Sequence, residues 1–130
     1  MTTLRVGIAS YEQMKARTLA VALGEQRARK YDPKIWFTSM ESFAKVLSDR
    51  NRALLALIAE TQPDSLAELS ELSGRAKSNL SRTLKTMERY GLVQLRKGQG
   101  GTMIPRVPYS GIALAVPLGS GRRDTSHTRV

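Results

Sequence analysis

The first residues of the chain alternate between apolar and polar side chains. Leu4, Val6 and Ile8 fall on one side of this alternation, which predicts a short strand over residues 3–8 with one buried face. Apolar and polar residues alternate again over residues 112–116. We expect these two segments to pair in one sheet.

A helical pattern follows the first strand. Ser10 fits an N-cap, and the residues after it predict a long helix over residues 11–29, although its apolar positions are loosely spaced. Asp32 and Pro33 indicate a loop. The apolar run 35–38 is compatible with a strand or with the entry to the next helix, because periodicity does not distinguish the two in so short a run.

Three further helices are predicted in the middle of the chain. Apolar residues three or four positions apart predict them over residues 39–47, 49–60 and 65–73. Ser65 and Glu68 have the spacing of a capping box, in which each side chain satisfies an unpaired amide at the other position. The expected buried stripe of the third helix comprises Leu66, Leu69 and Leu72.

The helix predicted over residues 76–90 has the clearest amphipathic pattern of the chain. It follows a turn that contains Gly74 and ends at Gly91. At about 100° per residue, its apolar face comprises Ala76, Leu80, Leu84 and Met87. The opposite face is polar and basic and comprises Ser78, Ser81, Arg82, Lys85 and Arg89.

A hairpin and a polar tail complete the pattern. Two extended segments, residues 92–97 and 102–107, flank the glycine-rich sequence 98–101, which predicts a β-hairpin. The glycine-rich sequence lacks the spacing and the Lys-Ser/Thr ending of a phosphate-binding loop, so we interpret it as a turn. From residue 118 onward the composition shifts to Gly, Ser, Thr and Arg, which predicts a disordered tail.

The order of a capped short helix, a glycine-containing turn, a basic amphipathic helix and a hairpin is that of a winged helix-turn-helix. We therefore predict a mainly α fold with a small β part (α+β), with an N-terminal strand and long helix added. Residues 1–34 are expected to form an N-terminal extension used for dimerisation, residues 35–117 the winged helix-turn-helix domain, and residues 118–130 the disordered tail.

The charge of the chain favours a polyanionic partner. The formal net charge is +10 and the isoelectric point is about 10.5. Between Arg75 and Arg106 there are eight basic residues and one acidic residue, whereas the segment from Glu60 to Glu71 has four acidic residues and no basic one. A basic membrane-surface helix would carry bulky apolar residues opposite its charges and no flanking turn-helix. This polarised pattern therefore favours DNA over a membrane surface.

Other classes of function find little support in the residues. The chain has no cysteine, its one histidine is His127 in the tail, and no carboxylate pair lies beside a candidate nucleophile, so we predict no enzyme activity, no metal site and no cofactor. No apolar run approaches the ~18 residues that span a bilayer. Without a recognisable export signal or disulfide framework, a cytoplasmic location is expected.

The helix over residues 76–90 is expected to enter the major groove of DNA, which accommodates one α-helix and presents distinct base edges. Arg82 can bond guanine with two hydrogen bonds, while Lys85 and Arg89 are expected to meet phosphate. The hairpin tip is expected to lie over the backbone or to reach the minor groove. The predicted DNA-contacting residues are Arg75, Lys77, Ser78, Asn79, Ser81, Arg82, Lys85, Arg89, Arg96, Lys97 and Gln99. For Asn79, base contact and plain helix surface remain alternatives.

Residues 36–117 resemble small prokaryotic winged helix-turn-helix regulators of the MarR-like type, including a group treated as antitoxins of toxin–antitoxin pairs. The resemblance is carried by residues 35–39, 66–69, 74–84 and 88–93. It implies a homodimeric repressor that binds two operator half-sites, with a toxin protein as a further partner. MarR-like dimers form through terminal helices. Because this chain ends in a strand and a polar tail, the helix over residues 11–29 is the segment available for dimerisation.

Two alternative functions remain on sequence grounds. The winged helix can dock a partner protein without sequence-specific DNA binding, using the long N-terminal helix or the basic tail. RNA binding is disfavoured because the major groove of A-form RNA is too narrow for this helix. Trp36, Phe37 and Phe43 resemble a base-stacking platform, but an isolated aromatic cluster among aliphatic residues is more often core or dimer interface.

Overall fold

A parallel three-stranded sheet connects the two ends of the described chain. The computed structural model describes residues 2–24 and 33–118. The strands of this sheet are β1 (Thr2–Ile8), β2 (Ile35–Phe37) and β5 (Tyr109–Ala115). β1 lies in the middle and runs parallel to both neighbours, with Val6 opposite Ile35 and Leu4 opposite Ile112. The predicted pairing of residues 3–8 with residues 112–116 is confirmed, and the run 35–38 contributes a strand.

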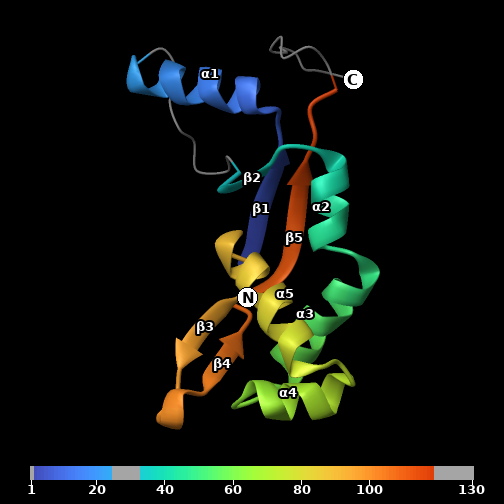
Figure 1. The fold of residues 1–130 in the computed structure, drawn as a ribbon. Helices are drawn as coiled ribbons and strands as arrows, with labels where there is room; N and C mark the ends of the chain where they lie inside the picture. Colours follow the sequence, from blue (N-terminus) through green and yellow to red (C-terminus); the bar gives the residue numbers. More distant parts are fainter. Residues whose placement is uncertain (1, 25–32, 119–130) are drawn as a thin grey trace.

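Along the described chain, one helix comes between β1 and β2, and the other helices and a hairpin come between β2 and β5 (Figure 1). The helices are α1 (Tyr11–Ala22), α2 (Met40–Val46), α3 (Asp49–Thr61), α4 (Leu66–Ser73) and α5 (Lys77–Arg89). The hairpin consists of β3 (Gln94–Lys97) and β4 (Met103–Arg106), joined by a short 3-10 turn (Gln99–Gly101). The fold is therefore mainly α with a small β part, as predicted, and helices α2 to α5 with the hairpin connect β2 to β5.

Helices α1 to α4 each have a serine as N-cap residue. Ser10, Ser39, Ser48 and Ser65 each accept a hydrogen bond from the backbone N–H three residues later. The capping box predicted at α4 is only half correct. The amide of Glu68 bonds the Ser65 hydroxyl at 3.0 Å, but the Glu68 carboxylate accepts from the N–H of Asp64, one residue before the cap, at 3.0 Å.

Helix α1 is shorter than the sequence predicts. It ends at Ala22, and Gly24 follows with a φ of 78°. This left-handed conformation is easily adopted by glycine and terminates a helix. The prediction of a helix continuing to residue 29 is therefore wrong at residues 23 and 24, and its remainder lies outside the described residues.

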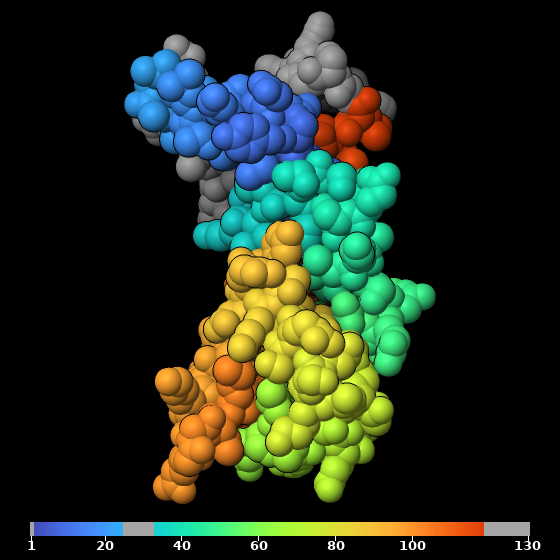
Figure 2. All heavy atoms as spheres, in the orientation of Figure 1, coloured from blue at the N-terminus to red at the C-terminus, as the bar shows by residue number. Residues whose placement is uncertain are grey.

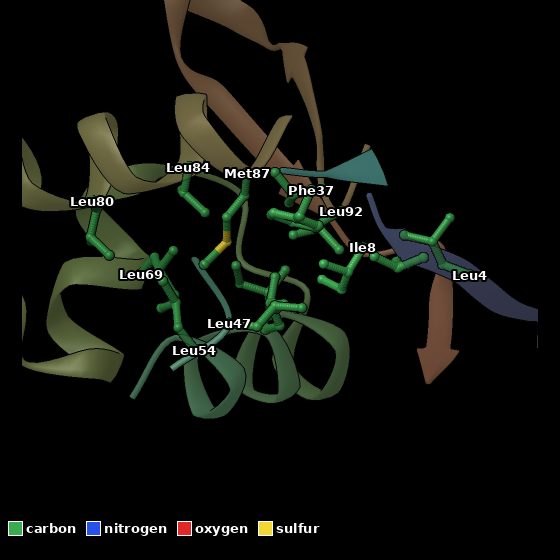
Figure 3. Close-up of a cluster of buried hydrophobic side chains, with 14 residues drawn as sticks. Leu4, Ile8, Phe37, Leu47, Leu54, Leu69, Leu80, Leu84, Met87 and Leu92 are labelled. Atoms are coloured by element: carbon green, nitrogen blue, oxygen red, sulfur yellow. The ribbon is translucent and has the colours of Figure 1, made fainter. Parts of the chain in front are cut away.

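One hydrophobic core joins the sheet to the helix-turn-helix (Figure 3). Its buried members are Leu4, Val6, Ile8, Phe37, Leu47, Leu54, Leu55, Ile58, Leu69, Leu80, Leu84, Met87, Leu92 and Val93. The predicted stripe of α4 is correct for the fully buried Leu69 but wrong for Leu72, which is 46% exposed. Periodicity identifies the face of a helix, but tertiary packing decides how far along that face its neighbours reach.

The two parts of the N-terminal segment pack differently. β1 contributes Leu4, Val6 and Ile8 to the same core as α5, whereas α1 has no buried residue. In Figures 1 and 2, α1 lies at one end of the elongated molecule, and α4 and the hairpin tip lie at the other. Apart from Leu118, the predicted disordered tail lies outside the described residues.

Candidate nucleic-acid interface

The turn between α4 and α5 is stabilised by hydrogen bonds between residues close in sequence. Gly74 caps α4 in the left-handed conformation, with φ of 74°, and donates its backbone N–H to the carbonyl of Ser70. The Ser70 hydroxyl in turn donates to the backbone carbonyl of Arg75 at 2.7 Å. Helix α5 begins directly afterwards at Lys77, and its N-cap residue, Ala76, makes no side-chain hydrogen bond to cap it. Helix α4, this turn, helix α5 and the hairpin β3–β4 form a winged helix-turn-helix, as the sequence predicts.

Helix α5 separates its apolar and polar residues onto opposite faces. Leu80, Leu84 and Met87 are 0% exposed and pack into the core, as Figure 3 shows. The predicted outer face contains exposed Ser78, Arg82, Lys85 and Arg89, with Ser81 partly buried at its flank. Lys77 in the first turn is exposed as well. The helix therefore presents hydroxyl and cationic groups to solvent along its whole length.

The cations of this outer face differ in their internal contacts. Arg89 donates to the hydroxyl of Thr86 at 3.3 Å. Within residues 2–24 and 33–118, Arg82 and Lys85 make no hydrogen bond or ion pair. Because their charged ends have no internal partner in that part of the chain, both side chains can bind an external anion without breaking an existing contact.

The hairpin β3–β4, which we call the wing, adds three of the predicted contact residues. Arg96 pairs with Ile104 and Lys97 with Met103 in the antiparallel register. Both cations are exposed, and Arg96 bonds only the side chain of Gln94 in the same strand, at 3.3 Å. Gln99 is exposed at the tip, where Gly100 has a φ of 68°. The tip thus follows directly on a strand that carries two exposed cations.

Arg106 anchors the wing to the helix-turn-helix, a role that the sequence did not reveal. Its Nη1 donates to the carbonyls of Pro63 and Pro105, each at 2.7 Å, and its Nη2 lies 3.5 Å from Oδ1 of Asp64. Pro63 and Asp64 belong to the loop before α4. The arginine therefore holds β4 against that loop. A local signal for this pairing is absent, because the partners are about 40 residues apart.

Arg75 and Asn79 are turned toward the protein. The Arg75 Nε donates to Oδ1 of Asn79 at 2.9 Å, its Nη1 to Oδ1 of Asn51 at 3.2 Å, and its Nη2 to Oγ1 of Thr83 at 3.2 Å. Burial, followed by repulsion from Arg50, lowers the pKa of Arg75. All three partners are neutral oxygens of the protein, so the guanidinium uses its fork of donors within the fold.

Acidic side chains lie on elements that precede helix α5 in the chain. Glu60, Asp64, Glu68 and Glu71 are all exposed at the end of α3, on the following loop and on α4. The polarity predicted from the sequence therefore corresponds to different elements, with α4 acidic and α5 and β3 basic.

The described residues contain neither a metal-ligand cluster nor a membrane-spanning helix. Residues 2–24 and 33–118 bring no three His, Cys, Asp or Glu side chains together as metal ligands. In the same ranges, every helix is too short or too polar to cross a lipid bilayer.

Comparison with known proteins places this arrangement in a family. A search of curated proteins finds no match. A solved structure, "Crystal structure of the predicted DNA-binding transcriptional regulator from E. coli", is similar to this chain with a TM-score of 0.45 and 16% identity, covering 78% of this chain and 86% of the other. Residues 46–114, from the end of α2 to near the end of β5, match the family described as HVO_A0114. The chain belongs to the HVO_A0114 family.

Proposed function

We propose that this protein binds double-stranded DNA and regulates transcription by recognising a specific sequence. The observation that carries the proposal is the division of α5 into a fully buried apolar face and an exposed face with Arg82, Lys85 and Arg89. A helix held by one face and cationic on the other fits the major groove, where arginine reads guanine and lysine meets phosphate.

The wing extends the same surface beyond the groove. Arg96 and Lys97 precede its tip on β3, and Gln99 lies at the tip itself. We assign these three side chains to the phosphate backbone or to the adjacent minor groove. Ser78 and Ser81 then contact base edges or phosphates from α5. Lys77 in the first turn and Arg89 in the last contact phosphates at either end of the helix.

We also propose that the regulator is a homodimer in which α1 is the dimerisation element. α1 has no buried residue. Its Tyr11 is 67% exposed and its Leu19 59%, and Leu23 at its C-cap is 62% exposed. Its position away from α4 and the wing (Figure 1) leaves the DNA-contacting end free. A two-fold dimer of this kind would read two half-sites about one helical turn apart.

A narrower proposal concerns the biological setting. The resemblance of residues 36–117 to MarR-like regulators supports a repressor that acts as the antitoxin of a toxin–antitoxin pair and controls its own operon. We expect expression of the neighbouring gene alone to arrest growth, and co-expression of this protein to relieve the arrest. A neighbouring metabolic gene with no effect on growth would contradict the antitoxin role and leave DNA binding unaffected.

DNA binding itself is tested by fluorescence anisotropy with duplexes selected from a random library by the wild-type protein. The logarithm of the binding constant should fall linearly with the logarithm of salt concentration, with a slope that reflects several neutralised phosphates. Arg82→Ala should cost about 1–3 kcal/mol and relax specificity, whereas Lys97→Ala should weaken all sequences alike and reduce the slope by about 1.

Lys45→Ala is the matched control for these variants. Lys45 is an exposed cation on α2, outside the proposed interface, so its removal should leave the slope and the specificity unchanged. If Arg82→Ala binds selected and scrambled duplexes as the wild type does, the assignment of α5 as the reading helix is wrong. If the wild type selects no duplex and shows no salt dependence, the DNA-binding proposal is wrong, and the alternative of a module that docks another protein becomes the one to test.

A further inference from the structure

The side chain of Arg75 connects three elements of the winged helix-turn-helix. Arg75 lies in the turn, Asn79 and Thr83 lie one and two turns along one flank of α5, and Asn51 lies in the first turn of α3. The three hydrogen bonds measure 2.9, 3.2 and 3.2 Å and use every nitrogen of the guanidinium. One rigid planar group thus spans α5 and α3.

Asn51, the partner of Arg75 on α3, is itself held by hydrogen bonds. The Nδ2 of Asn51 donates to the carbonyl of Val46 at 3.0 Å, and its backbone N–H donates to the Ser48 hydroxyl at 3.2 Å. These bonds hold the Asn51 amide with its oxygen toward Arg75. The guanidinium therefore binds to a fixed point on α3 and not to a freely rotating side chain.

The network opposes a rotation of α5 about its own axis. Leu80, Leu84 and Met87 bury one face of the helix, but apolar contacts have no preferred direction and resist a small rotation only weakly. The contacts to Asn79 and Thr83 lie beside that buried face, on the flank toward α3. A planar group bound to both helices resists such rotation because its donors have fixed directions.

We propose that Arg75 is a positioning residue that sets the orientation of α5, and that it acts through Asn51, Asn79 and Thr83 instead of contacting phosphate. The inference rests on the proposed function, since orientation matters here for DNA binding. It also assigns a direction to Asn79. The Asn79 oxygen faces the Arg75 donor, which leaves the Nδ2 amide to donate to a base or phosphate acceptor.

The test separates geometry from charge. Arg75→Lys keeps the charge but loses the planar fork, and Arg75→Gln loses both. If Arg75 positions the helix, both variants should bind the selected duplex about 10–100-fold more weakly, the scale of one to three lost hydrogen bonds. Both should keep the wild-type salt slope, because no phosphate contact has been removed. Lys85→Gln is the control for a phosphate contact and should reduce the slope by about 1.

A second measurement requires no DNA. Amide hydrogen exchange over residues 77–83 should accelerate in Arg75→Gln, and to a smaller extent in Thr83→Val, which removes one acceptor while preserving shape. Residues 54–58 of the core helix α3 should exchange as in the wild type, which shows that the variants remain folded.

The outcomes distinguish this inference from the proposed function. Wild-type affinity in Arg75→Lys would overturn the inference. A slope reduced by about 1 in Arg75→Gln would make Arg75 a phosphate contact and would overturn it as well. If the wild type binds no duplex, the proposed function fails, but the exchange measurement still decides the positioning role. Unchanged exchange over residues 77–83 in Arg75→Gln would overturn that role on its own.

Discussion

The C-terminal end of α5 is joined to the sheet by stacked aromatic rings, and the strength of this contact can be predicted. Tyr90 at the C-cap of α5 stacks on Phe37 of β2 with centroids 4.2 Å apart and planes 12° apart. Phe43 meets Phe37 edge-to-face at 5.3 Å and 86°. Phe37 is 1% exposed, so it makes both contacts without competition from water.

The perturbation is a double-mutant cycle of Phe37→Leu and Tyr90→Leu. An aromatic pair contributes about 0.5–1.5 kcal/mol beyond its buried area. Phe37→Leu removes two such pairs and leaves a small cavity, so it should lower the free energy of unfolding by about 2–4 kcal/mol. Tyr90→Leu removes one pair and should cost about 1–2 kcal/mol. The double mutant should be more stable than the sum predicts by about 0.5–1.5 kcal/mol, the energy of the shared pair.

Urea unfolding followed by circular dichroism measures these differences, at one fixed protein concentration because a dimer gains stability with concentration. Phe43→Leu combined with Tyr90→Leu is the comparison. These two rings meet only through their shared partner Phe37 in the ring pairs of the described residues, so their coupling should be smaller than that between Phe37 and Tyr90. A coupling below about 0.3 kcal/mol between Phe37 and Tyr90 is indistinguishable from additivity, and it would refute the stack as a link between helix and sheet.

Three further changes have expected outcomes. Leu69→Ala empties a site that is 0% exposed and should cost about 2–5 kcal/mol in urea unfolding; a cost below 1 kcal/mol would show that the core closes over the gap. Arg106→Ala removes the bond to the Pro63 carbonyl, so amide exchange in β3 and β4 should accelerate while α3 stays protected. Gly7→Ala places a Cβ 2.5 Å from the ring of Trp36 and should destabilise the fold by about 1–3 kcal/mol. Because Trp36 is the sole tryptophan, its emission should shift to longer wavelength, and unchanged emission would contradict the displacement.

Local patterns in the sequence predict most of the fold, because most of its elements are defined by local chemistry. The alternation of Leu4, Val6 and Ile8 predicts β1, and the spacing of Leu80, Leu84 and Met87 predicts the buried face of α5. The early end of α1 at Ala22 is a different case. Its loosely spaced apolar residues give no stripe whose end could be recognised, and Gly24 can lie within a helix or terminate one.

The sequence predicts the candidate interface as a group of cations but does not assign each cation a role. Arg75 and Arg106 belong to the same basic segment as Arg82 and Lys97, and their charge alone does not distinguish them. Arg106 is distinguished by the distant Pro63 carbonyl, and Arg75 by the distant Asn51 together with acceptors one and two turns along α5. Tertiary structure therefore divides one run of positive charge into cations that hold the fold and cations that face solvent.

This division determines how mutations in the interface should be interpreted. Helix α5 is held near its N-terminal end by Arg75, along its length by the buried stripe, and at its C-terminal end by the stack on Phe37. If α5 enters the major groove as we propose, a helix held in this way is already oriented, so only its exposed side chains lose conformational freedom on binding. Loosening any of these three attachments should disturb the orientation of α5 in the free protein. The resulting loss of affinity should therefore be similar for all DNA sequences. Removing the exposed Arg82 should leave the helix in place and, on the proposed function, change which base is preferred. The ratio of affinities for selected and scrambled duplexes therefore separates the two kinds of residue where affinity alone does not.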